Sequence, residues 1–273
     1  MGSEEERAGE ERAMETREAT GRQLVGGDDA ITTRLGAVAL PLGVIVLVVA
    51  EIFHPSREDP MDNAAVFKEY ANSDIWTTVH LGEYFGFLLL LGGLVALYYS
   101  VSAKPGVGAG LAPFGLAAAV TAAASFTVLQ AVDGIALKRA VEAWVSAPAA
   151  QESAAFAAAE AVRWIEMGMN SLSYFLAGLT LFLYGVAIVL GSVYPRWVGL
   201  IAVISGVALM YNGVVEVAYE GFVASTIKLV GFALWALWAF TMAVLMWRNG
   251  SRRRISRLAS TPTDPAQRPA SPH

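Results

Sequence analysis

The 273-residue sequence contains no cysteine, and this absence excludes several kinds of chemistry. Without thiols the chain cannot form disulfides, thiolate metal sites or a cysteine nucleophile. Histidine is almost as scarce, with His54, His80 and His273 as the complete set. Apart from His273 in the C-terminal tail, the histidines available for a site are therefore His54 and His80.

Charge is also sparse, because only 16% of the residues are charged while 55% are hydrophobic. Soluble domains carry about 25% charged residues, so this balance is typical of a membrane protein. We therefore expect an all-α polytopic membrane protein whose main partner is the lipid bilayer, and we expect no nucleic-acid partner.

Long apolar runs are what the sequence does contain. A hydrocarbon core about 30 Å thick requires roughly 20 apolar helical residues. Six stretches meet this requirement, and they predict a bundle of six transmembrane helices at about 33–53, 76–100, 111–135, 164–190, 197–220 and 223–247. We divide the chain into an acidic tail (1–30), the transmembrane domain (31–248) and a basic tail rich in proline and serine (249–273). Both tails are predicted to be disordered.

Two further helical features are expected at the outer side. After Pro55 and Pro60, Asp62 can cap a short helix through "NAAVFKEYA", and "APAAQESAAFAAAEAV" extends the fourth span outward. Asp74 is the expected cap of the second span, with Trp76 at the membrane interface.

The arginines after the last apolar run predict the orientation. The stretch "RNGSRRRISR" at 248–257 is strongly basic, and basic residues near span ends mark the cytoplasmic side. With six spans, both termini are then cytoplasmic, and the loops around 54–75 and 136–162 lie outside.

Polar residues gather near the predicted outer end of every span. They recur at spacings of three or four residues, which places each set on one helix face, and ionisable groups facing lipid are costly. We therefore predict a polar pocket open to the outer face, and we expect its ligand to be a cation or a small polar molecule. Its candidate residues are His80, Glu83, Asp133, Glu166, Asn170, Asn212, Glu216 and Lys228.

Other interpretations of these residues stay open. They could form a structural packing network in which Lys228 pairs with a carboxylate. Alternatively, His54, His80, Glu83 and Asp133 could hold a divalent metal ion in a membrane-embedded, hydrolase-like enzyme. His54 and His80 could also serve as haem ligands, although nothing else in the sequence supports haem. No motif requires a cofactor, and a divalent metal is the candidate that the residues allow.

One resemblance extends over most of the spans. The segments "HLGEYFGFLLLLGGLVALYYSV" and "GLTLFLYGVAIVLGSVYPRWVGLIAVISG" resemble a bacterial, actinobacterial-type family of multi-pass membrane proteins described as a domain of unknown function. In that family a "PRW(L/V)G" turn, like Pro195–Gly199 here, precedes the fifth span. The resemblance implies a six-span protein of the bacterial plasma membrane and brings no activity or catalytic residues.

Overall fold

The computed structural model describes residues 30–222 and 225–260, and within these residues the chain is helical and has no strand. Most of the two predicted tails therefore lies outside the described residues. Six of the described helices are long and apolar enough to cross a membrane: Ala30–Phe53, Trp76–Val101, Val107–Val145, Glu152–Leu190, Arg196–Glu220 and Thr226–Ser251. The expected all-helical fold with six candidate spans is confirmed.

Two of these spans are divided into shorter elements. The third consists of α4 (Val107–Ala131), the π-helical turn η1 (Val132–Leu137) and α5 (Lys138–Val145). The fifth consists of α7 (Arg196–Tyr211), the π-helical turn η2 (Asn212–Val217) and α8 (Ala218–Glu220). The remaining elements are α2 (Asn63–Ala71), α3 (Trp76–Val101), α6 (Glu152–Leu190) and α9 (Thr226–Ser260). Both π-helical turns thus interrupt spans that are otherwise α-helical.

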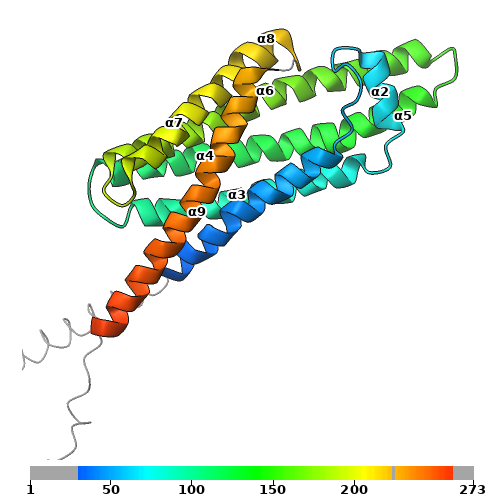
Figure 1. The fold of residues 1–273 in the computed structure, drawn as a ribbon. Coiled ribbons are helices and arrows are strands. Elements are labelled where there is room, and N and C mark those ends of the chain that lie inside the picture. The colour runs from blue at the N-terminus through cyan, green and yellow to red at the C-terminus, as the bar shows by residue number, and fades with distance from the viewer. Residues whose placement is uncertain (1–29, 223–224, 261–273) are drawn as a thin grey trace, which may run out of the picture.

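The helices form one bundle in which neighbours along the chain are mostly neighbours in space. Figure 1 shows α3, α4 and α6 side by side, with α7 against α6, while α9 and the first helix run obliquely to them. Close packing follows from small residues: the backbone of Gly93 approaches Leu40, and that of Gly36 approaches Ala96. Leu97, Tyr184, Trp238 and others fill the core between them.

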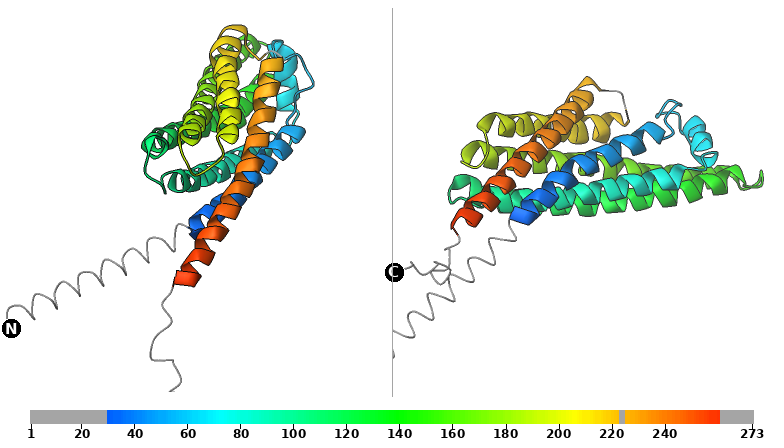
Figure 2. Two further views of the ribbon diagram at one scale, coloured as in Figure 1. Left: turned by 60° about the vertical axis from the view of Figure 1, so that its left-hand side comes forward. Right: turned by 60° about the horizontal axis from the view of Figure 1, so that its bottom comes forward.

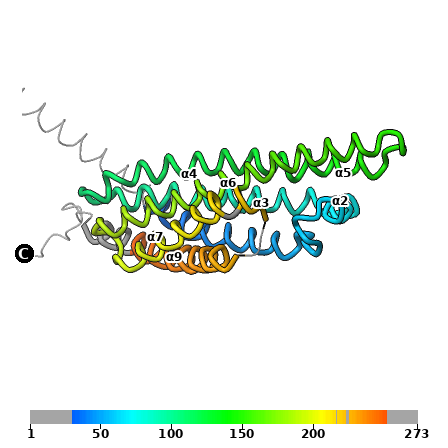
Figure 3. Tube along the Cα trace, turned by 90° about the horizontal axis from the view of Figure 1, so that it is seen from above, coloured from blue at the N-terminus to red at the C-terminus, as the bar shows by residue number. Residues whose placement is uncertain are grey.

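The two ends of the bundle differ. The start of the first helix and the C-terminal part of α9 lie together at one end, where Arg34 donates a hydrogen bond to Ser251 at 2.9 Å (Figure 2). The opposite end carries α2, α5 and the turn between α5 and α6, and we call it the α2 end. At this end the α5–α6 turn extends past the other elements (Figure 3).

A second small core holds the α2 end together. It contains Val66, Phe67 and Tyr70 of α2, Trp76 of α3, Leu137 of η1, Val141 and Trp144 of α5, and Ala159 of α6. The predicted cap of α2 is confirmed, because the Asp62 side chain accepts hydrogen bonds from the backbone of Ala64 and Ala65. The extension of the fourth span beyond its apolar run is confirmed in length: α6 has 39 residues, about 58 Å of helix at 1.5 Å per residue, which exceeds the bilayer core.

Two local predictions at the start of α3 are wrong. Ile75, not Asp74, is the N-cap residue, and no side chain caps this helix. Trp76 is fully buried instead of lying at an interface, because α2 and η1 pack over it. At the other end of the chain, α9 continues beyond residue 248 to Ser260, through arginines that are good helix formers.

Candidate metal centre

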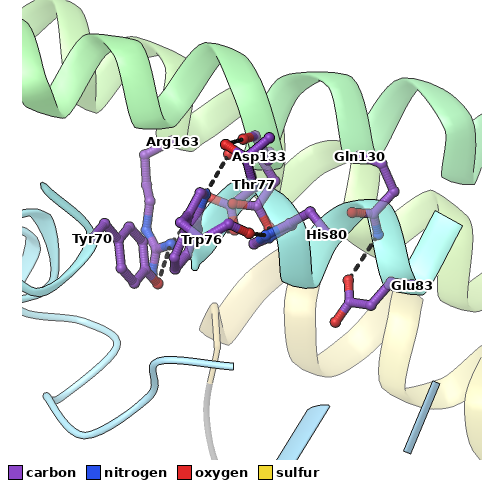
Figure 4. A network of polar contacts seen from close by, with 10 residues as sticks. Tyr70, Trp76, Thr77, His80, Glu83, Gln130, Asp133 and Arg163 are labelled. Carbon is purple, nitrogen blue, oxygen red and sulfur yellow. Dashed lines mark hydrogen bonds and ion pairs between the residues drawn. The ribbon is translucent and has the colours of Figure 1, made fainter. Parts of the chain in front are cut away.

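A histidine and an aspartate from two helices meet near the α2 end (Figure 4). His80 lies one turn into α3, and its Nε2 is 3.0 Å from Oδ2 of Asp133 in η1. The other ring nitrogen, Nδ1, lies 2.8 Å from the carbonyl oxygen of Trp76. Because a carbonyl oxygen only accepts hydrogen bonds, Nδ1 carries the proton, and Nε2 is the nitrogen that faces the carboxylate.

This arrangement requires a proton or a metal cation between the two side chains. A neutral imidazole with its proton on Nδ1 presents a lone pair at Nε2, and the carboxylate oxygen opposite presents another. Lone pairs 3.0 Å apart repel each other, so the contact needs either a proton between the two atoms, on the ring or on the carboxyl group, or a metal cation. Metal–ligand bonds of about 2.0–2.2 Å reach both atoms of such a pair. His80 and Asp133 can therefore act as an ion pair or as two ligands of one ion.

The π-helical turn η1 places the aspartate. In a π-helix the backbone bonds span five residues instead of four, which shifts the helix face that follows. Two side chains of α3 hold this turn: the Trp76 indole donates to the Asp133 carbonyl at 3.0 Å, and the Thr77 hydroxyl donates to the Gly134 carbonyl at 2.9 Å. A Cβ atom on Gly134 would lie 2.5 Å from Cβ of His80, so only glycine permits this approach.

His54 completes a group of three possible ligands. It follows directly after the first helix, and its ring centroid lies 5.1 Å from that of His80 and 5.0 Å from that of Trp76. One ligand atom each from His54, His80 and Asp133 can be chosen so that all three lie within 4.8 Å of one another. We call these three residues the His54–His80–Asp133 cluster. Burial lowers the pKa of His54, and the neighbouring His80 lowers it further, which favours the neutral, metal-binding form of the ring.

Chemically, the cluster offers two imidazole nitrogens and one carboxylate. Three protein ligands of this kind suit Zn²⁺ and similar divalent ions, and they leave a fourth position open. The hydrogen bond from Nδ1 of His80 to a backbone carbonyl is the usual support for a histidine ligand, because it fixes the ring and its tautomer. Asp133 Oδ1 is buried and has no hydrogen-bond partner among the described residues.

Glu83, the fourth metal ligand that we considered, does not belong to this cluster. It lies on α3 one turn deeper than His80, and its Oε2 accepts a hydrogen bond from Nε2 of Gln130 at 2.9 Å. The i,i+3 spacing from His80 therefore places Glu83 beside a different partner on α4, away from the group of three ligands.

A second polar group lies close by and is an ion pair. Arg163 of α6 binds Glu166 at 3.0 Å, and the two side chains are 2% and 4% exposed. The guanidinium also donates to the Tyr70 hydroxyl at 3.1 Å and to the Pro60 carbonyl at 3.0 Å. Glu166, a predicted pocket residue, is thus paired inside a network that ties the loop before α2 to α6.

The other predicted pocket residues belong to α6, η2 and α9. Asn212 of η2 is buried, Asn170 of α6 is partly buried, and Nζ of Lys228 lies 5.3 Å from the centroid of the Tyr174 ring. The side chain of Glu216 is outside the described part of the chain. Among the described residues, none of these joins the group of three possible metal ligands.

Sequence reasoning missed three residues that position the cluster. Trp76 donates its indole N–H to the Asp133 carbonyl, and its own carbonyl oxygen accepts from Nδ1 of His80. Gly134 permits the close approach of η1 to His80, and Tyr70 stacks on Trp76 with ring centroids 3.8 Å apart. The i,i+4 spacing of Trp76 and His80 was the available signal, since it places both on one helix face.

Comparison of the chain with protein-family models, with curated proteins and with solved structures finds no match.

Proposed function

We propose that this chain is an integral membrane protein that binds a divalent metal cation at the His54–His80–Asp133 cluster. The observation that carries the proposal is the geometry of His80, whose Nδ1 is occupied by a backbone carbonyl while its Nε2 faces a carboxylate beside a second imidazole. The buried Asp133 Oδ1, which has no hydrogen-bond partner among the described residues, agrees with a carboxylate that serves an ion. We place the protein in a bacterial plasma membrane with both termini in the cytoplasm and the cluster near the outer face.

Metal binding by the purified protein tests this proposal. Zn²⁺ affinity is measured by calorimetry in detergent, and Co²⁺ absorption reports the ligand set. His80→Ala, His54→Ala and Asp133→Asn should each weaken binding by more than about 100-fold, the upper end of what losing a supporting outer-shell group costs.

Two matched controls show whether a loss of binding comes from the cluster itself or from removing any histidine or carboxylate. His273→Ala removes the remaining histidine of the chain, and Asp74→Asn removes an exposed carboxylate near the same end. Both should bind Zn²⁺ as the wild type does. If the wild type binds no metal, or if the cluster variants bind as tightly as the controls, the proposal is wrong.

The open fourth position favours one second candidate, a metal-dependent enzyme of the hydrolase type. Catalytic zinc sites combine three protein ligands with a bound water, whereas structural sites use four protein ligands. In that case the Co²⁺ spectrum should change with pH as the bound water ionises. If the Co²⁺ spectrum stays constant over the pH range in which the protein ligands do not titrate, no bound water ionises there, and the enzyme candidate is contradicted.

A further inference from the structure

A charged side chain lies inside the first candidate span, at the end of the bundle opposite the cluster. Arg34 is one turn into the helix Ala30–Phe53, and its side chain is partly buried. An ionised group inside an apolar span is costly unless a partner balances its charge. Arg34 therefore requires a counter-charge at this end of the bundle.

Helix α9 gives Arg34 two neutral contacts. Nη2 of Arg34 donates to the Ser251 hydroxyl at 2.9 Å, and Cζ lies 5.1 Å from the centroid of the Trp247 ring. Trp247 and Ser251 are four residues apart in α9, so they lie on one face of this helix. Both contacts hold the guanidinium in position, but neither carries a negative charge.

The described chain offers no carboxylate at this end. The spans and turns that lie here contain no Asp or Glu over residues 30–40, 91–117, 180–206 and 241–251. The same ranges contain the cations Arg34, Lys104, Arg196 and Arg248. Beyond them, the sequence of α9 adds Arg252, Arg253, Arg254 and Arg257. The described part of the chain thus supplies Arg34 with no counter-charge.

The surface around Arg34 faces the membrane. Trp247 and Leu35 are 49% and 66% exposed, and Arg248 is exposed as well. They lie where the start of the first helix meets the C-terminal part of α9 (Figure 2). In a bilayer, a tryptophan beside arginines marks the level of the lipid head groups. A guanidinium at this level matches the phosphate oxygens of a lipid, because its donors form a planar fork.

The charge of this end selects among lipids. A zwitterionic head group brings an ammonium group together with its phosphate, and the surrounding cations repel that ammonium. An anionic head group brings a net negative charge, which complements a basic patch at the end of a span. The patch therefore favours an anionic lipid over a zwitterionic one.

We propose that Arg34 binds the phosphate of an anionic phospholipid. Trp247 and Ser251 hold its guanidinium in place, and the exposed Arg248 adds to the attraction. The inference goes beyond the proposed function, because it depends on the membrane-spanning fold and not on the cation cluster at the other end.

The test counts the lipids bound to the full-length protein in detergent by native mass spectrometry. Palmitoyl-oleoyl phosphatidylglycerol and palmitoyl-oleoyl phosphatidylcholine are the anionic and the zwitterionic probe. The wild type should bind the first phosphatidylglycerol at least about tenfold more tightly than phosphatidylcholine, as expected for one charge-assisted contact. Arg34→Gln should lose most of this preference.

Two further variants locate the lipid. Arg196→Gln is the matched control, because Arg196 is an exposed arginine beside the exposed Trp197 at the same end, but on α7. It should keep the preference of the wild type. Arg248→Gln changes an exposed side chain and so leaves the fold intact, and it should lower the preference about fivefold, the share of one basic residue near a membrane surface.

The contrary results are defined. Equal losses in Arg34→Gln and Arg196→Gln would overturn the proposal, because the charge of the whole end would then act without a site. An unchanged preference in Arg248→Gln would also overturn it, even if Arg34→Gln fails to fold.

Absence of a preference in the wild type overturns the proposal as well. If the full-length variant Asp28→Asn/Asp29→Asn then acquires a preference, these two residues, which precede the first helix in the sequence, are the counter-charge of Arg34 instead of a lipid. Zn²⁺ binding is measured separately, so none of these results decides the cation site.

Discussion

Arg163 offers a sharp test of how this protein holds its α2 end together. We predict that Arg163→Met destabilises the fold strongly. The change removes the ion pair to Glu166 and the hydrogen bonds to Tyr70 and Pro60, all within a buried network. It leaves the Glu166 carboxylate buried without its cation, while methionine retains much of the apolar volume.

Two ion pairs of the same spacing, one buried and one exposed, allow the effect to be estimated. Arg163–Glu166 and Arg139–Glu142 are both i,i+3 pairs, at 3.0 and 3.2 Å. The side chains of the first pair are 2% and 4% exposed, whereas those of the second are 80% and 38% exposed. Breaking a buried pair costs about 3–5 kcal/mol, and breaking an exposed pair costs about 0–1 kcal/mol. Arg163→Met should therefore cost at least about 2 kcal/mol more than Arg139→Met.

The free energy of unfolding in detergent, followed by tryptophan fluorescence under reversible conditions, measures this difference. The double variant Arg163→Met/Glu166→Leu should recover part of the loss, because it no longer buries an uncompensated charge. Equal losses for Arg163→Met and Arg139→Met would refute the reasoning, since burial would then make no difference to the two pairs.

Three other changes have defined outcomes. Gly134→Ala should lower the free energy of unfolding by about 1–3 kcal/mol and weaken Zn²⁺ binding, because the new Cβ would lie 2.5 Å from Cβ of His80. The control is Gly92→Ala, where a Cβ would meet nothing within 4 Å, and it should change neither the free energy of unfolding nor Zn²⁺ binding. In metal-free protein, the free energy of unfolding should fall as the pH drops through and below 6.5. The reason is that burial lowers the pKa of His54 in the folded protein, so the unfolded chain binds a proton on this ring more tightly. A weaker pH dependence in His54→Gln would confirm that His54 causes the effect, and an unchanged pH dependence would contradict it. Lys138→Met should speed proteolysis around α2, because Nζ donates to three carbonyls at the C-terminal end of that helix; cleavage at the wild-type rate would show that other contacts hold α2.

The spans were predictable because their signal is local. Apolar length alone identifies a candidate span, and the six runs in the sequence became six helices. The Asp62 cap and the long extension of α6 were predictable for the same reason, since each depends on a few adjacent residues. Trp76 was mispredicted because its environment comes from α2 and η1, which lie elsewhere in the sequence.

For the candidate site, the level of each residue along its helix was predictable, but the direction in which its side chain points was not. Helical rise placed His54, His80 and Asp133 near one level, and the structure brings them together. The direction in which each side chain points depends on how every helix is turned about its axis, which the rise does not give. Glu83, at nearly the same level, therefore reaches Gln130 instead of the metal ligands.

The π-helical turn η1 has a consequence for insertions and deletions. Such a turn holds one residue more than an α-helical turn over the same hydrogen-bonded step. Deleting one residue between 132 and 137 would restore α-helical register and rotate the helix on one side of the deletion by about 100° relative to the other. The Asp133 carboxylate could then face His80, or α5 could face α2, but not both. The length of this span, and not only its residues, thus ties the cluster to the second core.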